Sequence, residues 1–190
     1  MRGCRPLTDE EVKLIASSFS GSSAGRDRCL FTLGWNSGFR VSELLSLTVG
    51  DVLQHREIVD RVTVQRRATK GKRESRTVVL NGRAQTALRR WLGEMGDVSP
   101  GTPLFPSRKG DGAISRVQAH RVLKAAVGAN ELQGKIASHS MRKTFAEKVY
   151  DKLDGDLPKL QKALGHASIN STISYLSFKQ EDVDKAILLI

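Results

Sequence analysis

One short stretch of strand-type sequence, with helical sequence on both sides, constrains the fold of this chain most. Residues 58–64 and 75–80 are rich in valine, isoleucine and threonine, which favour strands. The sequence before and after them repeats its apolar residues at helical intervals. A basic segment, residues 66–73, separates the two predicted strands. We therefore predict a mainly helical α+β fold with a small antiparallel β-sheet.

The helix boundaries follow from capping signals and glycines. The first helix begins at Thr8, because Thr8 and Glu11 have the spacing of a capping box. A second helix is predicted over residues 25–37, until Gly38 ends it, and another helical turn or two over residues 41–47. Residues 93–112, rich in glycine, proline and serine, are predicted to form a connecting loop. The remaining helices are predicted at residues 83–92, 115–127, 138–153, 157–164, 168–176 and 181–189.

Length and charge bound the class of protein. The 190 residues suit one domain, here predicted to be residues 1–190. Lysine and arginine number 31 against 20 acidic residues, a net charge of +11, which indicates a polyanionic partner. Aromatic residues make up only 5% of the chain, which argues against stacking on single strands and favours the phosphates of double-stranded DNA. Without a long apolar run or a secretory signal, we expect no membrane association and a cytoplasmic location.

Several polar side chains occupy positions that a packed core does not require. Arg40 and Glu43 follow the glycine that ends the second helix, and His139 and Arg142 share one face of a later helix. Tyr175 comes nine positions after a histidine at a glycine turn. Taken singly, a helical His-x-x-Arg pair is more often a solvated face, and a helical tyrosine is more often packing. Their order along the chain argues for a site.

The order of these segments resembles the catalytic domain of the tyrosine recombinases, the phage integrase family. Residues 38–47 (GFRVSELLSL) resemble the first arginine box of that family, and residues 70–74 (KGKRE) its β-hairpin lysine. Residues 139–146 (HSMRKTFA) resemble the His-x-x-Arg box. Residues 164–168 (LGHAS), followed by 172–175 (TISY), resemble the last histidine and the nucleophile. The likeness runs from about residue 7 to residue 178.

The resemblance implies that Arg40 and Arg142 clamp the scissile phosphate and that Glu43 supports them. Guanidiniums suit this task because they offer planar, permanently charged donors to the oxygens that gain charge in the transition state. Such a clamp can replace a divalent metal, so we expect neither a metal nor a cofactor. Further cations are expected to bind DNA: Arg66, Arg67, Lys72, Arg73 and Lys143.

The resemblance also implies that Tyr175 attacks DNA and becomes joined to the 3′ phosphate. A tyrosine hydroxyl has an ordinary pKa of about 10 and needs a base. By resemblance, His139 and His166 assist proton transfer and hydrogen-bond the phosphate. Lys70 would protonate the leaving 5′ oxygen, and its cationic neighbours would favour a lowered pKa. The covalent link conserves the energy of the broken bond, so rejoining needs no ATP.

These residues predict a site-specific recombinase that cleaves and rejoins double-stranded DNA. We expect a monomer that assembles as a homotetramer on recombining DNA, in the cytoplasm and associated with the nucleoid. DNA relaxation of the type IB topoisomerase kind stays open, although the spacing of the boxes disfavours it. A catalytically inert DNA-binding regulator also stays open, although retention of the full set of site residues disfavours it.

Two regions leave alternatives open. Family members commonly carry an N-terminal helical domain that clamps DNA, but Arg40 has only 39 residues before it, so no such domain is expected within these residues. Either a longer protein was shortened or the enzyme is naturally short. At the other end, residues 182–190 are amphipathic, and either pack on a neighbouring protomer or fold onto their own domain.

Overall fold

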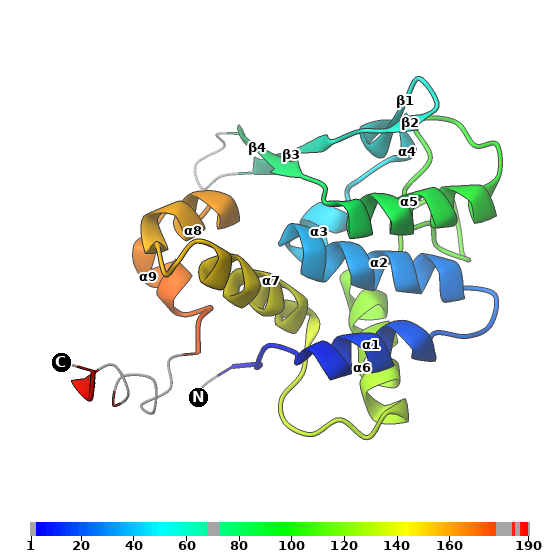
Figure 1. Ribbon diagram of the computed structural model, residues 1–190. Helices are drawn as coiled ribbons and strands as arrows, with labels where there is room; N and C mark the ends of the chain where they lie inside the picture. The colour runs from blue at the N-terminus through cyan, green and yellow to red at the C-terminus, as the bar shows by residue number, and fades with distance from the viewer. Residues whose placement is uncertain (1–2, 68–72, 178–183, 185–186, 190) are drawn as a thin grey trace. The chain divides into compact units, whose positions relative to one another are not determined.

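The computed structural model describes residues 3–67, 73–177, 184 and 187–189 (Figure 1). The chain divides into two compact units, residues 1–145 and 146–190, and the boundary falls within helix α7 (Ser138–Lys152). No described helix combines the length and the apolar character needed to span a bilayer.

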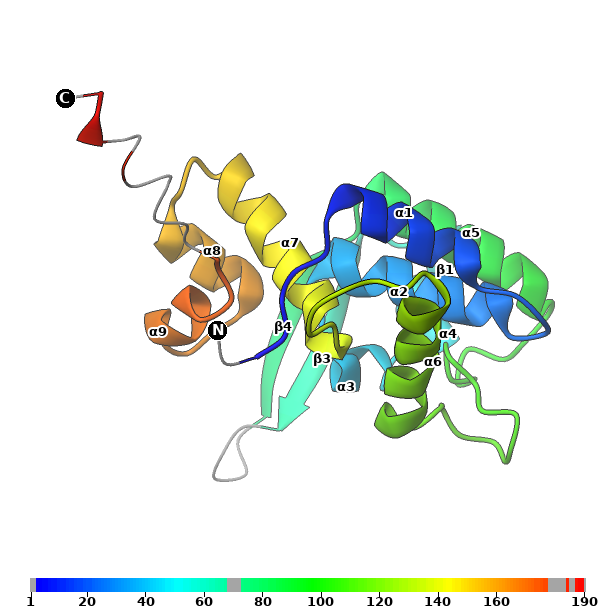
Figure 2. The same ribbon diagram turned by 90° about the horizontal axis from the view of Figure 1, so that it is seen from below.

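The first unit is mainly helical, as predicted. The α2 helix packs against α5, and α1 contacts both α2 and α6 (Figures 1 and 2). The α5 helix continues three residues into the segment predicted to be a loop. The helices of this unit before α7 are α1 (Asp9–Ser18), α2 (Ala24–Ser37), α3 (Val41–Leu44), α4 (Val49–Val52), α5 (Gly82–Met95) and α6 (Arg116–Ala129).

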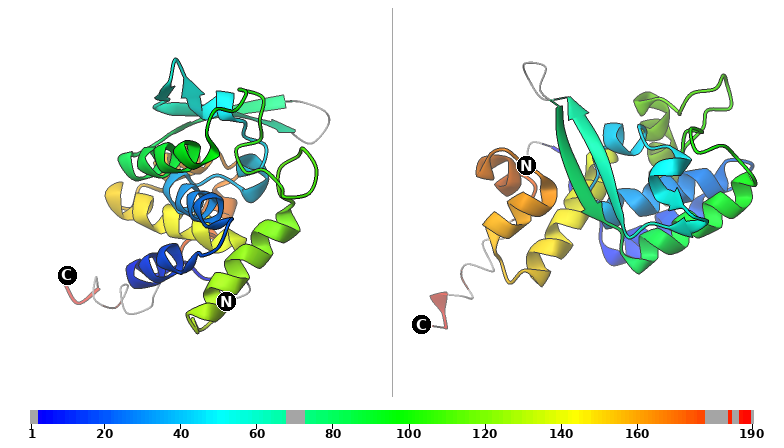
Figure 3. Two further views of the ribbon diagram at one scale, coloured as in Figure 1. Left: turned by 90° about the vertical axis from the view of Figure 1, so that its right-hand side faces the viewer. Right: turned by 90° about the horizontal axis from the view of Figure 1, so that it is seen from above.

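The antiparallel pairing predicted for the strands is confirmed. Strand β3 (Arg61–Arg67) pairs with β4 (Arg73–Val79), and the two form a long ribbon (Figure 3, right). The first strand begins three residues later than predicted, because Ile58 belongs to a separate pair of two-residue strands, β1 (Leu53–Gln54) and β2 (Glu57–Ile58). Two consecutive residues with positive φ, at positions 55 and 56, make the turn of that pair.

The β3–β4 ribbon has one buried face and one exposed face. Val62, Val64 and Val78 are buried, whereas Thr63 and Thr77 are exposed and their hydroxyls lie 2.9 Å apart. This alternation follows from the period of two along a strand. The buried valines join residues of α2 and α5 in one apolar cluster, and a second cluster fills the space between α1, α2 and α6.

The second unit contains the rest of α7, α8 (Leu157–Leu164) and α9 (Ile169–Ile173), with α8 packed on α9. The α8 helix has the predicted bounds and ends at Gly165, whose φ is +61°. The α9 helix is shorter than predicted, because the chain leaves it at Ser174 and continues as a turn. Most of the helix predicted at residues 181–189 lies outside the described residues.

Candidate active site

A buried carboxylate, Glu43, lies at the centre of the first unit's candidate site. Its side chain is only 5% exposed. The α3 helix begins immediately after Arg40, and Glu43 closes a cap there by accepting the Arg40 backbone N–H at 2.7 Å. The Arg40 guanidinium donates a second hydrogen bond to the other carboxylate oxygen, 2.9 Å from Nη1. Glu43, which was predicted to support the site, therefore makes a two-point contact that fixes both the backbone and the head group of Arg40.

Arg142 reaches the same carboxylate from helix α7. Its Nη1 lies 4.0 Å from Glu43 Oε2 and donates a hydrogen bond to the carbonyl of Gly38. The Arg142 side chain is 1% exposed, so its charge is almost wholly removed from bulk water. Gly38 has a φ of +60°, and a Cβ there would collide with the ring of Phe145. Glycine at this position therefore ends α2 and lets α7 approach.

A third guanidinium, that of Arg76, was not singled out from the sequence. Arg76 lies on β4, and its Nη1 is 3.5 Å from Glu43 Oε2. The alternation of residues along the strand could have indicated its position. Arg76, Val78 and Leu80 fall on one face of β4, and the two apolar residues of that face are buried. We call Arg40, Arg76 and Arg142 the arginine cluster.

The electrostatics of the cluster favour an anion. Burial alone would raise the pKa of Glu43, but the backbone and side-chain hydrogen bonds from Arg40 and the charges of Arg76 and Arg40 outweigh burial and lower it. Glu43 is therefore ionised at neutral pH. Three guanidiniums lie within 4.0 Å of this one carboxylate, so arginine charges from three elements are brought to one point of the fold.

His139 lies in the first turn of α7, three residues before Arg142. Its pKa is lowered from the ordinary value of 6.5, first by partial burial of the ring and then by the charges of Arg142, Arg40 and Lys143. The imidazole is therefore neutral at pH 7 and able to accept a proton. Lys143 was predicted to bind DNA; the residue is buried, with 9% of its surface exposed, and its role stays a prediction.

The second unit brings His166 and Tyr175 together. Their ring centroids lie 4.9 Å apart. His166 is buried, with its Nδ1 3.1 Å from the hydroxyl of Thr172 and its backbone carbonyl accepting a hydrogen bond from the Gln161 amide at 3.0 Å. Because Nδ1 is engaged by Thr172, Nε2 is the ring nitrogen suited to proton exchange. The sequence analysis gave Thr172 no role.

Tyr175 follows α9 and does not belong to it, contrary to the sequence prediction. Its backbone N–H donates to the carbonyl of Thr172 at 3.0 Å, so the tyrosine sits in the tight turn that continues from the helix end. Leu176, next along the chain, is buried and Tyr175 is half-buried. The buried neighbour anchors the turn.

The remaining predicted residues are described in part or not at all. Lys70, the predicted general acid, and Lys72 lie outside the described residues. The backbones of Arg66, Arg67 and Arg73 lie at the ends of β3 and β4 next to the basic turn, and Arg67 pairs with Arg73 in the register. The predicted role of these side chains in binding DNA stays a prediction.

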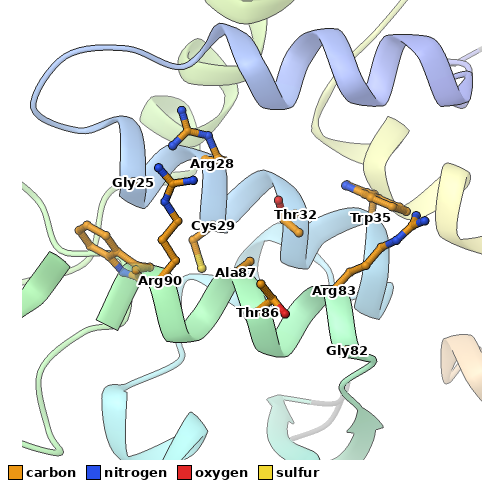
Figure 4. Close-up of a pocket in the computed structure, with 11 residues that line it drawn as sticks. Gly25, Arg28, Cys29, Thr32, Trp35, Gly82, Arg83, Thr86, Ala87 and Arg90 are labelled. Carbon is orange, nitrogen blue, oxygen red and sulfur yellow. The ribbon is translucent and has the colours of Figure 1, made fainter. Parts of the chain in front are cut away.

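A pocket of about 420 Å³ lies elsewhere in the first unit, between α2 and α5 (Figure 4). We call it the α2–α5 pocket. Its lining is mostly apolar, and it includes Arg28 and Arg90 near one end and Arg83 beside Trp35 at the other. No residue predicted to be catalytic or to bind DNA lines it. The residues that line it are Gly25, Arg28, Cys29, Thr32, Trp35, Gly82, Arg83, Thr86, Ala87, Arg90 and Trp91.

Comparison with known sequences places these features in a family. The probable integrase/recombinase YoeC of Bacillus subtilis (strain 168) is 34% identical over 161 residues, which cover 85% of this chain and 82% of YoeC. The tyrosine recombinase XerC of Erythrobacter litoralis (strain HTCC2594) is 38% identical over 149 residues, which cover 77% of this chain and 44% of XerC. The chain thus spans about half the length of the XerC relatives it matches.

Solved structures agree on the fold. The XerA recombinase superposes on the whole chain with a TM-score of 0.78 at 24% identity, using 64% of its own length. The XerH site-specific recombinase, in a post-cleavage complex with its palindromic difH substrate, superposes on 96% of the chain with a TM-score of 0.72 at 25% identity, using 51% of its own length. The match to the phage integrase family runs from residue 5 to residue 181. Because that span takes in the arginine cluster as well as Tyr175, this chain belongs to the phage integrase family.

Proposed function

We propose that this chain cleaves and rejoins double-stranded DNA as a site-specific recombinase, with Tyr175 as the nucleophile. The observation that carries the proposal is the convergence of Arg40 and Arg142 on one buried, ionised carboxylate. Two guanidiniums held in this way need no rearrangement when charge develops on the phosphate, and this preorganisation stabilises a transition state. Relatives and neighbours named as recombinases support the same assignment.

In the proposed reaction, the scissile phosphate binds at the arginine cluster. Arg40 and Arg142 donate hydrogen bonds to its two non-bridging oxygens, and Glu43 keeps the Arg40 head group in place through the 2.9 Å contact. Burial of Arg142 and Glu43 strengthens these interactions, because a low local dielectric weakens electrostatic forces less than water does. The neutral imidazole of His139 would donate its one N–H to the phosphate, and its other ring nitrogen would be available to accept a proton.

The covalent step belongs to Tyr175. Its phenolic oxygen attacks phosphorus, the bond from phosphorus to the 5′ oxygen breaks, and a 3′-phosphotyrosine remains. The phenolic proton passes to a base, for which the Nε2 of His166 is suited by the Thr172 contact on its other nitrogen. Lys70 would protonate the departing 5′ oxygen. Attack by a 5′ hydroxyl of a second strand reverses these events and completes strand exchange.

The DNA partner and the assembly are part of the same proposal. The net charge of +11 suits a DNA-bound protein, and the solved XerH neighbour is bound to its difH substrate. Exchange between two duplexes requires four cleavages, so we propose a homotetramer on recombining DNA that forms from monomers. A DNA-bound enzyme of this kind would be found with the nucleoid.

The test is a covalent-adduct assay with nicked double-stranded DNA that carries candidate attachment sites. Nicking lets the short 5′ fragment diffuse away after cleavage, so the adduct accumulates. We expect a protease-sensitive species on the 3′ side of the cleaved strand, in the presence of EDTA, that is absent with Tyr175→Phe. An adduct that persists in Tyr175→Phe would overturn the assignment of the nucleophile.

A second measurement separates recombination from the alternatives. Relaxation of a supercoiled plasmid without a specific site would favour topoisomerase-like activity over recombination. Salt-sensitive DNA binding with no adduct on any site tested would favour a DNA-binding regulator. We expect an adduct that depends on the DNA site, and recombinant products when two such sites are supplied.

A further inference from the structure

We propose that Arg76 is a positioning residue for the phosphate-binding arginines, acting through Glu43 and the Gly38 carbonyl. The inference rests on the proposed function, because it assigns Arg76 to the same reaction. It adds a residue on the β-hairpin that no motif of the sequence marked.

The contacts of Arg76 converge on the groups that hold Arg40 and Arg142. Its Nη1 lies 3.5 Å from Glu43 Oε2 and 3.5 Å from the Gly38 carbonyl oxygen, and its Nη2 lies 3.5 Å from the Ser37 carbonyl oxygen. The Gly38 carbonyl also accepts from Arg142, and Glu43 Oε2 lies 4.0 Å from the same Arg142 nitrogen. Two arginines from different elements thus share both acceptors.

The sharing gives Arg76 a mechanical role. From strand β4, the Arg76 guanidinium attracts both the Gly38 carbonyl and the Glu43 carboxylate, and this attraction holds the two acceptors in place. Arg142 then meets them in one geometry, so its guanidinium is held in one orientation. All three distances of Arg76 are long for hydrogen bonds, so the guanidinium acts chiefly as a positive charge held by its surroundings.

The position of Arg76 shows that the charge is not incidental. The side chain is 8% exposed and lies on the strand face that also carries Val78 and Leu80. A buried charge carries a large desolvation penalty, and a well-packed apolar residue there would often be as stable. The guanidinium also lies over the ring of Phe39, 6.0 Å from its centroid, so its apolar surface is packed. A stability requirement alone would be met by a residue like Val78.

The charge of Arg76 also acts on Glu43. It helps to lower the pKa of Glu43 and so to keep the carboxylate ionised where burial opposes ionisation. Without Arg76, the carboxylate would lose one of the charges that hold it ionised, and the place that it gives to Arg40 and Arg142 would be less fixed. We therefore expect loss of Arg76 to slow the chemical step with little effect on DNA binding.

The experiment measures single-turnover cleavage by Arg76→Gln and Arg76→Lys. Arg61→Gln serves as the matched control, because Arg61 is an exposed arginine on the same hairpin and its loss removes the same charge. We expect Arg76→Gln to slow cleavage roughly 10- to 100-fold, less than removal of a direct transition-state donor. Arg76→Lys, which keeps the charge without the planar fork, should recover part of the rate. Arg61→Gln should cleave within about threefold of the wild type.

A sulfur-substituted substrate tells positioning of the phosphate site from an effect on the leaving group. When sulfur replaces the 5′ bridging oxygen of the scissile phosphate, the leaving thiolate needs no proton. Lys70→Ala, the positive control, should therefore be rescued by this substrate. Arg76→Gln should keep its full defect on it. Rescue of Arg76→Gln by the sulfur substrate would overturn the inference and assign Arg76 to the leaving-group side.

Two control measurements separate an effect on folding from an effect on cleavage. DNA affinity and the thermal transition of each variant show whether a rate defect comes from loss of folded protein. If Arg76→Gln does not fold, Arg76→Lys carries the test alone, with a defect of at least threefold that the sulfur substrate leaves unchanged. A rate of Arg76→Gln equal to that of Arg61→Gln would refute the inference and leave the proposed function intact. Absence of an adduct with the wild type would instead count against the proposed function.

Discussion

The first unit holds two groups of three arginines, and they differ in where the guanidiniums point. Those of the arginine cluster converge on one buried carboxylate, Glu43. Those of the α2–α5 pocket are bound separately. Arg28 donates to the carbonyls of Ala16 and Phe19, Arg83 lies over Trp35 at 5.7 Å from the ring centroid, and Arg90 pairs with Glu94 at 3.5 Å.

The difference shows that arginine content does not by itself make an anion site. In the α2–α5 pocket, each guanidinium faces its own acceptor or ring, so the charges are spread over two helices. In the arginine cluster, strand, loop and helix deliver three charges to one point that is largely closed to water. Convergence in a low dielectric is what can stabilise a developing negative charge.

Among the substitutions that test this comparison, Arg142→Ala is expected to change the cleavage rate most. We expect Arg142→Ala to slow cleavage roughly 10²- to 10³-fold, because it removes a preorganised donor to the transition state. The measurement is single-turnover adduct formation at saturating protein. Arg83→Ala, which removes an arginine from the α2–α5 pocket, is the matched control and should stay within about twofold of the wild type. A loss below about threefold with Arg142→Ala would contradict the phosphate clamp.

How far the sequence predicts this site depends on the kind of signal each residue leaves. Arg40, Glu43 and Arg142 were predicted from their motifs, and the structure brings these three together. Arg76 belongs to no motif and is revealed only by its register against Val64 in the hairpin. Tyr175 was predicted as a candidate but placed on a helix, because helical spacing alone cannot tell a helix from the turn that ends it.

The fold shows the same division between local and non-local signals. The capping box at Thr8 is confirmed, with Glu11 accepting the Thr8 N–H at 2.9 Å and donating its own N–H to the threonine hydroxyl at 3.2 Å. The mainly helical class with antiparallel strands is confirmed as well. The division into two compact units has no counterpart in the sequence, because it depends on packing between distant segments and α7 runs through the boundary without a break.

A smaller effect is expected in the pH dependence of cleavage. Because the pKa of His139 is lowered, the imidazole becomes half-protonated only at a pH below its ordinary pKa of 6.5. If cleavage needs the neutral ring, the rate should decline as the pH falls through that lowered pKa. His139→Gln should remove that decline from the pH–rate profile.

Lys143 sharpens the same measurement. Its charge is one of those that lower the pKa of His139, together with Arg142 and Arg40, so Lys143→Met should move the acid decline toward pH 6.5. The shift isolates electrostatics, because His139 itself is unchanged. A profile of Lys143→Met that coincides with that of the wild type would show that His139 does not set the acid decline.

The smallest effect is expected in the α2–α5 pocket, at Arg90. Its side chain is 67% exposed, and an exposed pair of this kind four residues apart contributes about 0.3 to 0.5 kcal/mol before screening by salt. Arg90→Ala should therefore lower the thermal midpoint by only about 1 °C and leave cleavage within about twofold of the wild type. A tenfold loss of cleavage in a fully folded Arg90→Ala protein would mean that the pocket takes part in binding DNA. Arginines that are bound separately would then contribute to cleavage as the convergent arginine cluster does.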